Sequence, residues 1–506
     1  MSTDIDFKLI KKINKVVKKY WGFDSLKDKQ MEIITNFIKK KDVIGLLPTG
    51  YGKSMCYLVP PLVKKKVIFI ISPLISLMED QKEKLEEMNI PVSCLHGNNF
   101  NKDKEIFEII DGNINIVYMS PEFLIRGDGL ELAKTLNENK KLGYIAVDES
   151  HCISVWGHDF RSDYLKIKNF RTMFPKIPFL AVTATATFQV INEIALHLTL
   201  REPLLVRANF DRPNLFLRCT NVETTDQNEI MKLIEPYLTK YRHSKIIIYT
   251  NSRKDCVDYS DKINKKHKDS SHAYHAGMSK KMRFKIQNNF NTGECKIIVS
   301  TVAFGMGIDQ IVRCVLILGA PSSIEDYYQQ IGRAGRDKDP AETVLFFQYK
   351  NIVIGKHMCS KNSELMSQDV IKHKKKNLDI MAKFFYTNGC RRKYILSYFG
   401  QIPKFFCCYN CDNCCDRELK NYTNKIKKLM FSEEIKNKIS TSKLIEEIFS
   451  QKQIHILIKN DLIKDFSSKH YSYNYIVSDE LQNWKKVLEV NNKIAKIPMK
   501  YKIKLF

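Results

Sequence analysis

The stretch "VIGLLPTGYGKSMCYLVPPL" (residues 43–62) joins a short apolar run, a turn with two glycines and an apolar segment that can open a helix. This order is typical of a phosphate-binding loop between a strand and a helix, because glycines let backbone N–H groups close on phosphates. Such a loop is usually written G-x-x-x-x-G-K-[S/T]. Gly52, Lys53 and Ser54 match its end, whereas Leu47 occupies the position of its first glycine. The stretch therefore predicts a nucleotide site with one unusual position.

The phosphate loop lies in the first of two α/β series along the chain. Between about 43 and 206, short β-rich runs alternate with longer polar segments of helical character, and the pattern returns between about 245 and 347. Such alternation is typical of parallel sheets. The runs are VIGLL, KVIFIIS, INIVYMS, YIAVDES and FLAVTAT in the first series, and KIIIYT, CKIIVST, VRCVLILGA and ETVLFF in the second. We predict two α/β lobes with a linker near 207–216.

The composition indicates a globular, multidomain protein with a basic surface. The chain has 506 residues, of which 44% are hydrophobic, and its formal net charge is +26. A charge of this size suggests a large polyanion as partner. Lysine-rich surfaces also arise from A+T-rich coding, so the charge alone leaves nucleic acid as one of two explanations.

Neither a membrane span nor a signal peptide is evident in the sequence. No apolar run approaches the ~20 residues of a transmembrane helix, and the start "MSTDIDFKLIKK" lacks the apolar core of a signal peptide. We expect a soluble, intracellular protein. It would work in the nucleus or at the site of DNA replication if the source is eukaryotic or viral, and in the cytoplasm if it is bacterial.

A pair of acidic residues downstream supports the nucleotide site. "AVDESH" is an apolar strand that ends in Asp148 and Glu149. In a phosphate loop, Lys53 would reach the β- and γ-phosphate oxygens and Ser54 would bind Mg²⁺. An acidic residue at the end of a neighbouring strand serves the same Mg²⁺, and a second carboxylate can orient or deprotonate the attacking water. The pairing indicates hydrolysis of ATP and makes a solvated acidic turn a poor explanation.

Seven motifs stand in the order and spacing of a RecQ-type helicase, which this chain resembles from about residue 20 to 415. The run "HCISVWGHDFR" and the "SPLISLMEDQ" block resemble RecQ proteins in particular. The motifs are PTGYGKS, SPLISLMEDQ (72–81), DESHCISVWGHDFRSDY (148–164), TATAT (183–187), FDRPN (210–214), VAFGMGID (302–309) and YYQQIGRAGRD (327–337). The resemblance implies two RecA-like parallel-sheet lobes and an ATP-dependent, monomeric DNA helicase that moves 3′ to 5′ in repair and recombination. It also explains Leu47, because the helicase loop is T-G-x-G-K-[S/T] and begins at Thr49.

The resemblance further implies a set of residues around ATP. Gln30 matches the glutamine that reads adenine, but Lys27 stands where the family has an arginine. Lysine offers no planar fork, so adenine selectivity is expected to be looser than phosphate binding. The implied nucleotide-binding residues are Lys27, Gln30, Leu47, Pro48, Thr49, Gly50, Tyr51, Gly52, Lys53, Ser54, Asp148 and His151.

Two further groups carry over from the resemblance. "CISVWGHDFR" matches the aromatic-rich loop that couples single-stranded DNA to hydrolysis, in which Trp156 and Phe160 can stack on bases. The alternative is that these aromatics are buried in the core. The loop residues are Ser154, Trp156, His158, Phe160 and Arg161. In the second lobe the implied catalytic residues are Gln329, Arg333 as a γ-phosphate contact and Arg336 as an arginine finger, joined to Lys53, Asp148 and Glu149 of the first.

Six of the 14 cysteines fall between Cys390 and Cys415, and in a reducing compartment such a cluster favours a metal over disulfides. By the family's spacing, Cys390, Cys408, Cys411 and Cys414 would hold a structural Zn²⁺. The alternative set uses Cys407, Cys411 and Cys415.

The basic tail reads as helix, helix and β-wing. "SKLIEEIF" and "KQIHILIKNDLIKDF" have helical periodicity, and "SKHYSYNYIVS" follows them. A winged helix could bind duplex DNA, with His470, Tyr471 and Tyr473 at its tip; the alternatives are an unspecified helical domain and a hairpin packed on its own domain. We predict four domains: a first helicase lobe (1–206), a second lobe (207–347), a helical zinc-binding subdomain (348–416) and a winged-helix domain (417–506).

Two other functions fit parts of the sequence. An RNA helicase shares the DExH core, and nothing in the core motifs excludes a ribose 2′-OH. A DNA-binding scaffold with a relic core is the second alternative, against which the intact Lys53, Asp148, Glu149 and Arg336 argue.

Overall fold

The computed structural model describes residues 2–97, 99, 101–125, 127–154, 160–267, 270–304, 310–361, 367–405, 407–415, 463–465 and 475–477. The chain divides into two compact units. The first contains Met1–Lys383 and Ile395–Pro403, and the second contains Phe384–Tyr394 and Lys404–Phe506.

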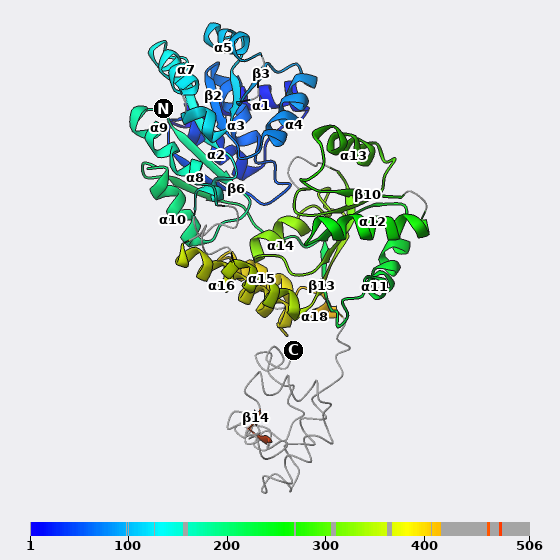
Figure 1. Ribbon diagram of the computed structural model, residues 1–506. Coiled ribbons are helices and arrows are strands. Elements are labelled where there is room, and N and C mark those ends of the chain that lie inside the picture. The colour runs from blue at the N-terminus through cyan, green and yellow to red at the C-terminus, as the bar shows by residue number, and fades with distance from the viewer. Residues whose placement is uncertain are drawn as a thin grey trace. The chain divides into compact units, whose positions relative to one another are not determined.

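The first unit contains two parallel β-sheets, drawn in blue to cyan and in green in Figure 1. The seven-stranded sheet has the order β3-β4-β2-β5-β6-β1-β7, and the six-stranded sheet has the order β10-β11-β9-β12-β13-β8. The strands of the first are β1 (Val43–Leu46), β2 (Val67–Ile71), β3 (Val92–Leu95), β4 (Ile116–Met119), β5 (Leu142–Val147), β6 (Phe179–Thr183) and β7 (Leu204–Arg207). Those of the second are β8 (Leu215–Asn221), β9 (Lys245–Thr250), β10 (Ser271–Tyr274), β11 (Ile297–Ser300), β12 (Val312–Leu318) and β13 (Ala341–Phe347).

Helices connect the strands of each sheet. We call the seven-stranded sheet and its helices lobe 1, and the six-stranded sheet and its helices lobe 2. The helices of lobe 1 are α1 (Ser2–Trp21), α2 (Asp28–Ile38), α3 (Met55–Lys64), α4 (Ile75–Glu87), α5 (Lys102–Asp111), α6 (Pro121–Ile125), α7 (Gly127–Glu138), the 3₁₀ helix η1 (Ser150–Ile153), α8 (Ser162–Leu165), α9 (Ile167–Met173) and α10 (Phe188–His197). Those of lobe 2 are α11 (Gln227–Lys240), α12 (Arg253–His267), α13 (Lys280–Thr292) and α14 (Ile324–Ile331), and beyond them lie α15 (Tyr349–Lys361), α16 (Gln368–Tyr386), α17 (Arg391–Tyr398) and α18 (Asp412–Cys415).

The central strands are apolar because helices cover both faces of a parallel sheet. Every residue of β1, β2, β4 and β6 is buried in lobe 1, as is every residue of β11 and β13 in lobe 2. The strands β1 and β6 run in register from Val43 opposite Leu180 to Leu46 opposite Thr183. Their carboxyl ends therefore open at one edge of the sheet, where the phosphate loop begins.

The two sheets share one strand order. When seven is added to each strand number, β3-β4-β2-β5-β6-β1 of lobe 1 becomes β10-β11-β9-β12-β13-β8, which is the order of lobe 2. Only β7 has no counterpart. Each loop at the carboxyl edge of lobe 1 thus has a topological equivalent in lobe 2.

Four strands are absent from the sequence prediction. β3, β7, β8 and β10 are short or carry polar residues, as in "SHAY" for β10 and "LFLRCTN" for β8. The connection between the lobes runs from 208 to 214, so the expected linker at 207–216 includes one residue of β7 and two of β8.

The tail is described only at two short strands. β14 (Ile463–Asp465) pairs antiparallel with β15 (Tyr475–Val477), with Ile463 opposite Val477. The prediction of a helix through the end of "KQIHILIKNDLIKDF" is therefore wrong at residues 463–465, where a strand has found a partner. The remainder of the predicted winged helix, including His470, Tyr471 and Tyr473, lies outside the described residues. Within the part of the chain that is described, no helix is long and apolar enough to cross a membrane.

Candidate nucleotide and metal sites

The phosphate loop follows β1 directly. The Leu47 N–H donates to the carbonyl oxygen of Thr183 at 3.0 Å, and the Leu47 side chain is fully buried, so this residue continues the strand and presents no side chain to a ligand. Gly50 and Gly52 have φ angles of 78° and 88°. Only glycine adopts this left-handed region without strain. The local backbone thus requires glycine at 50 and 52 and leaves Leu47 free to be apolar.

The loop lysine is held by an acidic residue at the end of β5. Lys53 Nζ lies 2.8 Å from Glu149 Oε1, and both side chains are largely buried. Burial on its own raises the pKa of Glu149, but the Lys53 charge and the contact with His151 outweigh it, and the pKa lies well below its usual value. Glu149 is therefore a carboxylate, and its φ of 45° is a strained conformation for a residue with a side chain.

The neighbouring Asp148 is more deeply buried than Glu149, and its pKa is shifted in the opposite direction. It is 6% exposed, and its Oδ1 accepts from the Glu149 N–H at 3.0 Å while its Oδ2 accepts from the Tyr57 hydroxyl at 3.3 Å. Burial and the adjacent Glu149 charge raise the pKa of Asp148 to about 6. A cation bound at this carboxylate would oppose the shift by favouring the ionised form.

A polar relay connects this acidic pair with lobe 2. His151 Nδ1 lies 3.3 Å from Glu149 Oε2 and 2.8 Å from Thr183 Oγ1. Thr183 Oγ1 also contacts the backbone of Thr185, whose hydroxyl accepts from Gln329 Nε2 of lobe 2 at 3.3 Å. Gln329 thereby reaches the end of β6 from α14.

Both lobes line one cavity of ≈ 260 Å³. Lobe 1 contributes the phosphate loop, the acidic pair and Ala184 after β6, and lobe 2 contributes residues from the end of α14 and the loop after it. Arg336 lies against the loop, since a Cβ added to Gly50 would stand 3.5 Å from its Cγ atom. The lining residues are Thr49, Gly50, Gly52, Lys53, Ser54, Tyr57, Leu77, Gln81, Lys84, Asp148, Glu149, Ala184, Gln329, Arg333 and Arg336.

Sequence reasoning did not assign a role to several of these residues. Leu77, Gln81 and Lys84 lie on or beside the quoted "SPLISLMEDQ" motif, and their i, i+4 and i+7 spacing along α4 puts them on one face. That spacing was the available signal. Tyr57, three residues after Ser54, carried no signal of its own.

A second missed group positions the arginine loop. Arg212 Nη2 donates to the carbonyl oxygens of Ala334 and Gly335, each at 2.8 Å, and Asn214 Nδ2 donates to that of Gly335 at 2.8 Å. Gly335 has a φ of 55°, and a Cβ there would meet Asn214 Nδ2 at 2.4 Å. The "FDRPN" motif therefore holds the loop between Arg333 and Arg336 in place.

The residues predicted to read adenine contact the phosphate loop, and their role toward a base stays a prediction. Gln30 Nε2 donates to the carbonyl oxygens of Tyr51 and Gly52 at 3.1 and 2.9 Å. Lys27 Nζ donates to that of Tyr51 at 2.9 Å and lies 4.6 Å from the centre of its ring. Burial and the nearby Lys338 lower the pKa of Lys27. Neither Lys27 nor Gln30 lines the cavity as described.

The described ends of the aromatic-rich loop are anchored on lobe 1. Ser154 Oγ donates to Glu193 Oε2 at 2.6 Å, and Arg161 Nη1 donates to the carbonyl oxygen of Pro73 at 2.6 Å. Phe160 is 37% exposed, so it is not a core aromatic. Trp156 and His158 lie outside the described residues.

The second unit contains a cluster of four cysteines. The Sγ atoms of Cys390, Cys408, Cys411 and Cys414 all lie within 4.8 Å of one another, and those of Cys408 and Cys414 are 3.8 Å apart. Zn–S bonds of about 2.3 Å in a tetrahedron place sulfurs about 3.8 Å apart, so the cluster fits Zn²⁺. Cys415 is exposed and its Sγ contacts the Tyr409 carbonyl oxygen at 2.9 Å, which argues against the alternative ligand set.

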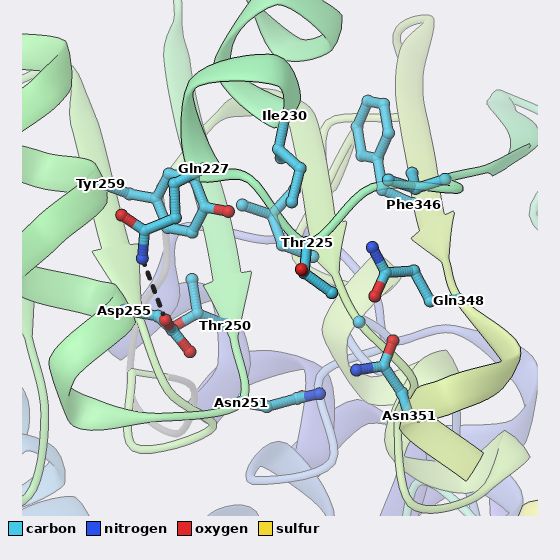
Figure 2. Close-up of a pocket in the computed structure, with 13 residues that line it drawn as sticks. Thr225, Gln227, Ile230, Thr250, Asn251, Asp255, Tyr259, Phe346, Gln348 and Asn351 are labelled. Carbon is cyan, nitrogen blue, oxygen red and sulfur yellow. Dashed lines mark hydrogen bonds between the residues drawn. The ribbon is translucent and has the colours of Figure 1, made fainter. Parts of the chain in front are cut away.

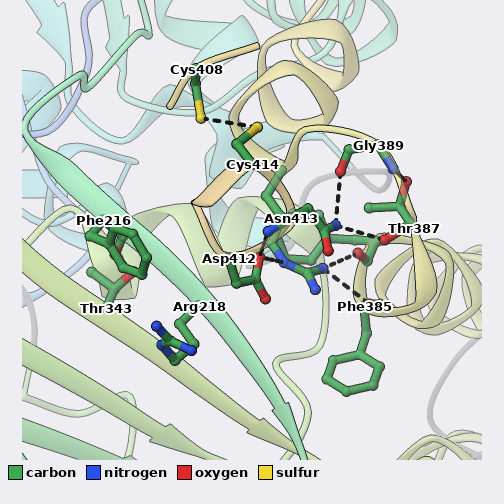
Figure 3. Close-up of polar contacts among 12 residues, drawn as sticks. Phe216, Arg218, Thr343, Phe385, Thr387, Gly389, Cys408, Asp412, Asn413 and Cys414 are labelled. Carbon is green, nitrogen blue, oxygen red and sulfur yellow. Dashed lines mark hydrogen bonds and ion pairs between the residues drawn. The ribbon is translucent and has the colours of Figure 1, made fainter. Parts of the chain in front are cut away.

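Buried polar contacts join the two segments that carry these cysteines (Figure 3). Arg391 Nε donates to Asp412 Oδ1 at 2.6 Å, and both side chains are at most 10% exposed. Asn413 Nδ2 donates to the carbonyl oxygens of Thr387 and Gly389 at 2.7 and 2.8 Å. Residues next to Cys390 and Cys414 thus fix the spacing that a metal requires.

Three protein families match consecutive parts of the chain. The DEAD/DEAH box helicase family matches residues 27–194, the helicase conserved C-terminal domain matches 227–338, and the RecQ zinc-binding family matches 349–415. These ranges contain the phosphate loop, the arginine loop and the cysteine cluster, respectively.

Curated relatives and solved structures agree with these families. A protein of Acanthamoeba polyphaga mimivirus that carries the name of an ATP-dependent RNA helicase is 38% identical over 83% of this chain and 74% of its own length. The ATP-dependent DNA helicase RecQ of Haemophilus influenzae is 34% identical over 79% of this chain and 63% of its own. The ATP-dependent helicase SGS1 of Saccharomyces cerevisiae is 36% identical over 89% of this chain, which spans only 31% of it. The helicase MrfA, in a crystal structure with DNA and AMPPNP, shares the fold with a TM-score of 0.57 at 20% identity, over 77% of this chain and 58% of that one.

Two parallel-sheet lobes that meet at a cavity with a phosphate loop, an acidic pair and two arginines define an ATP-dependent helicase. The zinc-binding family match and the curated relatives place it further: the chain belongs to the RecQ family. ATP and Mg²⁺ are standard for its helicase domains, and the cysteine cluster fits a structural Zn²⁺.

Proposed function

We propose that this chain is a DNA helicase that moves 3′ to 5′ on single-stranded DNA and opens forked or junction DNA as a monomer. The observation that carries the proposal is the single cavity into which lobe 1 places Lys53 and Glu149 and lobe 2 places Arg333 and Arg336. Because one chain supplies both halves of the site, no second copy is needed for hydrolysis. The net charge of +26 suits a polyanionic track whose affinity falls with salt.

The geometry suggests the order of events in the site. Lys53 is paired with Glu149. Triphosphate would compete for Lys53 and release the Glu149 carboxylate to orient and deprotonate the attacking water. Ser54 and Asp148 would hold Mg²⁺, which supplies charge neutralisation at the phosphates when bound. Arg336 would stabilise the charge that develops on the γ-phosphoryl group.

Hydrolysis is coupled to movement because the site is divided between the lobes. Loss of the γ-phosphate would remove the ligand that Lys53 and Arg336 share, and the lobes would then be free to separate. Gln329 and Thr185 provide a second link that senses the same closure. Cycles of closing and opening would advance the chain along one strand.

An RNA helicase is the second candidate, because the mimivirus relative carries that name. The two are separated by unwinding assays on 3′-tailed DNA, 5′-tailed DNA, forks, four-way junctions and tailed RNA duplexes. We expect 3′-tailed DNA and forks to open, and 5′-tailed duplexes and RNA to remain closed. If RNA opens and no 3′-tailed DNA does, the proposal fails.

The unwinding assay also needs a variant that has lost ATP hydrolysis but is otherwise intact. Lys53→Ala should abolish unwinding and ATP turnover, whereas Lys41→Ala, an exposed lysine of lobe 1, should leave both unchanged. Equal turnover in wild type and Lys53→Ala would instead support a scaffold that binds DNA.

We also propose that Cys390, Cys408, Cys411 and Cys414 are the zinc ligands. Cys408→Ser should release metal and lower the melting temperature, whereas Cys407→Ser, at the adjacent position, should retain metal. The zinc content per chain is measured for both variants. Unchanged zinc in Cys408→Ser would refute the ligand set without affecting the helicase proposal.

We infer finally that the protein is located in the same cellular compartment as the DNA on which it acts. That is the nucleus or the site of DNA replication in a eukaryotic or viral setting, and the cytoplasm in a bacterial one. Localisation of the tagged, full chain relative to replicating DNA tests this inference.

A further inference from the structure

Lobe 2 contains a cavity at the place that corresponds to the nucleotide site of lobe 1. In lobe 1 the cavity is lined after β1, β5 and β6 and along the helix after β2. In lobe 2 a cavity of ≈ 230 Å³ is lined after β8, β12 and β13 and along the helix after β9. These are the equivalent strands in the shared order. Carboxyl ends of parallel strands are where open α/β sheets bind ligands.

The lobe 2 cavity lacks what binds phosphate. The loop after β8, "NVETTDQNE" (221–229), has no glycine and no basic residue, and includes Glu223, Asp226 and Glu229. Gly319 stands directly after β12, where lobe 1 has its first acidic residue, Asp148. Among the described residues that line the cavity there is no lysine or arginine, although the chain as a whole carries +26. The described lining thus offers no cationic group to a triphosphate.

Two polar groups without hydrogen-bond partners in the described structure line this cavity, and one of them, Asn351 Oδ1, is a buried atom. Tyr259 is 4% exposed, and its hydroxyl has no hydrogen bond among the described residues. Asn351 Oδ1 is buried and likewise has no partner in the described structure. A buried polar atom without a hydrogen bond is unfavourable, so Asn351 Oδ1 favours an occupant that donates to it, and the Tyr259 hydroxyl can bond to the same occupant. Figure 2 shows the two residues on opposite sides of the cavity, with the Tyr259 hydroxyl directed toward the other lining residues.

The lining combines amides with apolar walls. Asn251, Gln348 and Asn351 provide side-chain amides, and Ile230 and Phe346 provide apolar surface. Amides of this kind pair with the hydrogen-bonding edge of a nucleobase, and apolar side chains cover its faces. The cavity is close in volume to that of lobe 1, so selection against phosphate depends on the lining residues and not on size.

We propose that lobe 2 has a second ligand site, which binds an uncharged nucleobase or nucleoside and rejects nucleotides. Asp255 reinforces the selection: its carboxylate accepts from Gln227 Nε2 at 3.3 Å and from Ser252 Oγ at 2.6 Å and has no cationic partner among the described residues. It repels a phosphate and favours a ligand that carries amino groups. The base belongs either to a free nucleoside or to an unpaired position of a strand whose phosphates stay outside the cavity. The proposal goes beyond the helicase activity and does not rest on it.

The test uses the zinc-loaded full chain with the lobe 1 cavity saturated by a non-hydrolysable ATP analogue and Mg²⁺. Binding of adenosine, guanosine, cytidine and thymidine is then measured by saturation-transfer NMR and calorimetry, with the 5′-monophosphate of each as the charged comparison. We expect at least one nucleoside to bind under these conditions and its monophosphate to bind about tenfold more weakly. Displacement of the nucleoside by a short single-stranded oligonucleotide would identify a strand as the source of the base, and its persistence would identify a free nucleoside.

Two variants assign the binding to this cavity. Tyr259→Phe keeps the ring and removes the hydroxyl, and Asn351→Ala removes the amide; each should weaken nucleoside binding roughly 3- to 10-fold. Tyr274→Phe, which removes a buried hydroxyl of lobe 2 outside the cavity, is the matched control. ATP turnover without nucleoside should be unchanged in all three, which verifies folding. The proposal is overturned if no nucleoside binds once lobe 1 is filled, if both variants bind as wild type does, or if the monophosphate binds equally well.

Discussion

Lobe 1 and lobe 2 have the same strand order but opposite chemistry at their carboxyl edges. The lobe 1 cavity receives Lys53 and Lys84 from its own lobe and Arg333 and Arg336 from lobe 2. The lobe 2 cavity has only the carboxylate of Asp255 among its charged lining groups that the structure describes. Topology thus determines where a cavity forms, and a few loop residues determine what it accepts.

The different positions of the functional residues in the two lobes also explain why lobe 2 can lack a phosphate loop. Its contribution to hydrolysis comes from the loop after α14, which leads into the amino end of β13 and lies away from its own carboxyl edge. Arg212 and Asn214 hold that loop from the segment between the lobes. In the proposed mechanism lobe 2 would act on the ATP bound in lobe 1, and the proposed second ligand would bind at the carboxyl edge of lobe 2.

The largest effect is expected when lobe 2 loses its contact with the phosphates. Arg336→Ala should lower ATP turnover by roughly 10³- to 10⁵-fold, the range for arginine fingers, while ATP still binds to lobe 1. Steady-state turnover and binding of a fluorescent ATP analogue measure the two quantities. Arg242→Ala removes an exposed arginine of the same lobe and serves as the control. A variant that hydrolyses ATP normally would show that lobe 1 works alone.

The next effect compares the amino edges of the two sheets. Asp42, just before β1, is fully buried with Arg171, and its carboxylate also accepts from the N–H groups of Phe179 and Arg201 at 2.9 and 2.7 Å. Glu342, in β13, pairs with Lys240, whose side chain is 59% exposed. Asp42→Asn should cost about 3–5 kcal/mol, because Arg171 remains buried without a counter-charge.

Glu342→Gln is the matched variant in lobe 2 and should cost about 1 kcal/mol or less, since Lys240 regains water. Urea unfolding of both variants measures the difference. Equal losses would show that the pair of the exposed Lys240 with the buried Glu342 stabilises lobe 2 as strongly as the Asp42–Arg171 pair stabilises lobe 1.

A third effect concerns the conflict between function and stability at Asp148. Its folded pKa of about 6 exceeds its ordinary value of 3.8, so the fold prefers the protonated form. The stability from that preference is fully present below pH 3.8 and is lost as the pH rises through 6. In Mg²⁺-free buffer at pH 8, Asp148→Asn should therefore be more stable than wild type, by about 1–3 kcal/mol, and inactive in ATP turnover.

The gain should shrink as the pH falls from 8 to 4.5, because wild type then protonates Asp148. Thermal unfolding across this range measures it. Loss of stability in Asp148→Asn at pH 8 would mean that the ionised carboxylate is satisfied by Tyr57 and the Glu149 N–H alone.

The sequence predicted the elements whose chemistry is local. Apolar runs such as "KVIFIIS" identify buried strands, and Lys53 and the Asp148–Glu149 pair are recognisable from a few neighbouring residues. The strands β8 and β10 were missed because their polar residues serve edge positions, which only the assembled sheet defines. Without β8, the shared strand order of the lobes and the lobe 2 cavity could not be foreseen.

Contacts between segments that are far apart in the sequence could not be predicted either. Arg212 lies in a quoted motif, but its hydrogen bonds go to residues more than 120 positions away. Gln30 and Lys27 were predicted to read adenine, which stays a prediction, and the sequence did not reveal that both bond to carbonyl oxygens of the phosphate loop. A side chain's residue type indicates the bonds it can make, and only the fold selects among them.

The smallest expected effect concerns how lobe 1 recognises the base. In lobe 1 the phosphate end has several charged contacts, whereas Lys27 and Gln30 are engaged with Tyr51 and Gly52. Lys27→Arg should raise the kcat/KM for ATP relative to GTP about threefold, because the planar guanidinium can bond to the loop and still stack on a base. Lys29→Arg, at an exposed neighbouring position of α2, should leave the ratio unchanged. If wild type already prefers ATP strongly and Lys27→Arg does not change the ratio, residues other than Lys27 select the base. The cavities of lobe 1 and lobe 2 would then differ less in base binding than in phosphate binding.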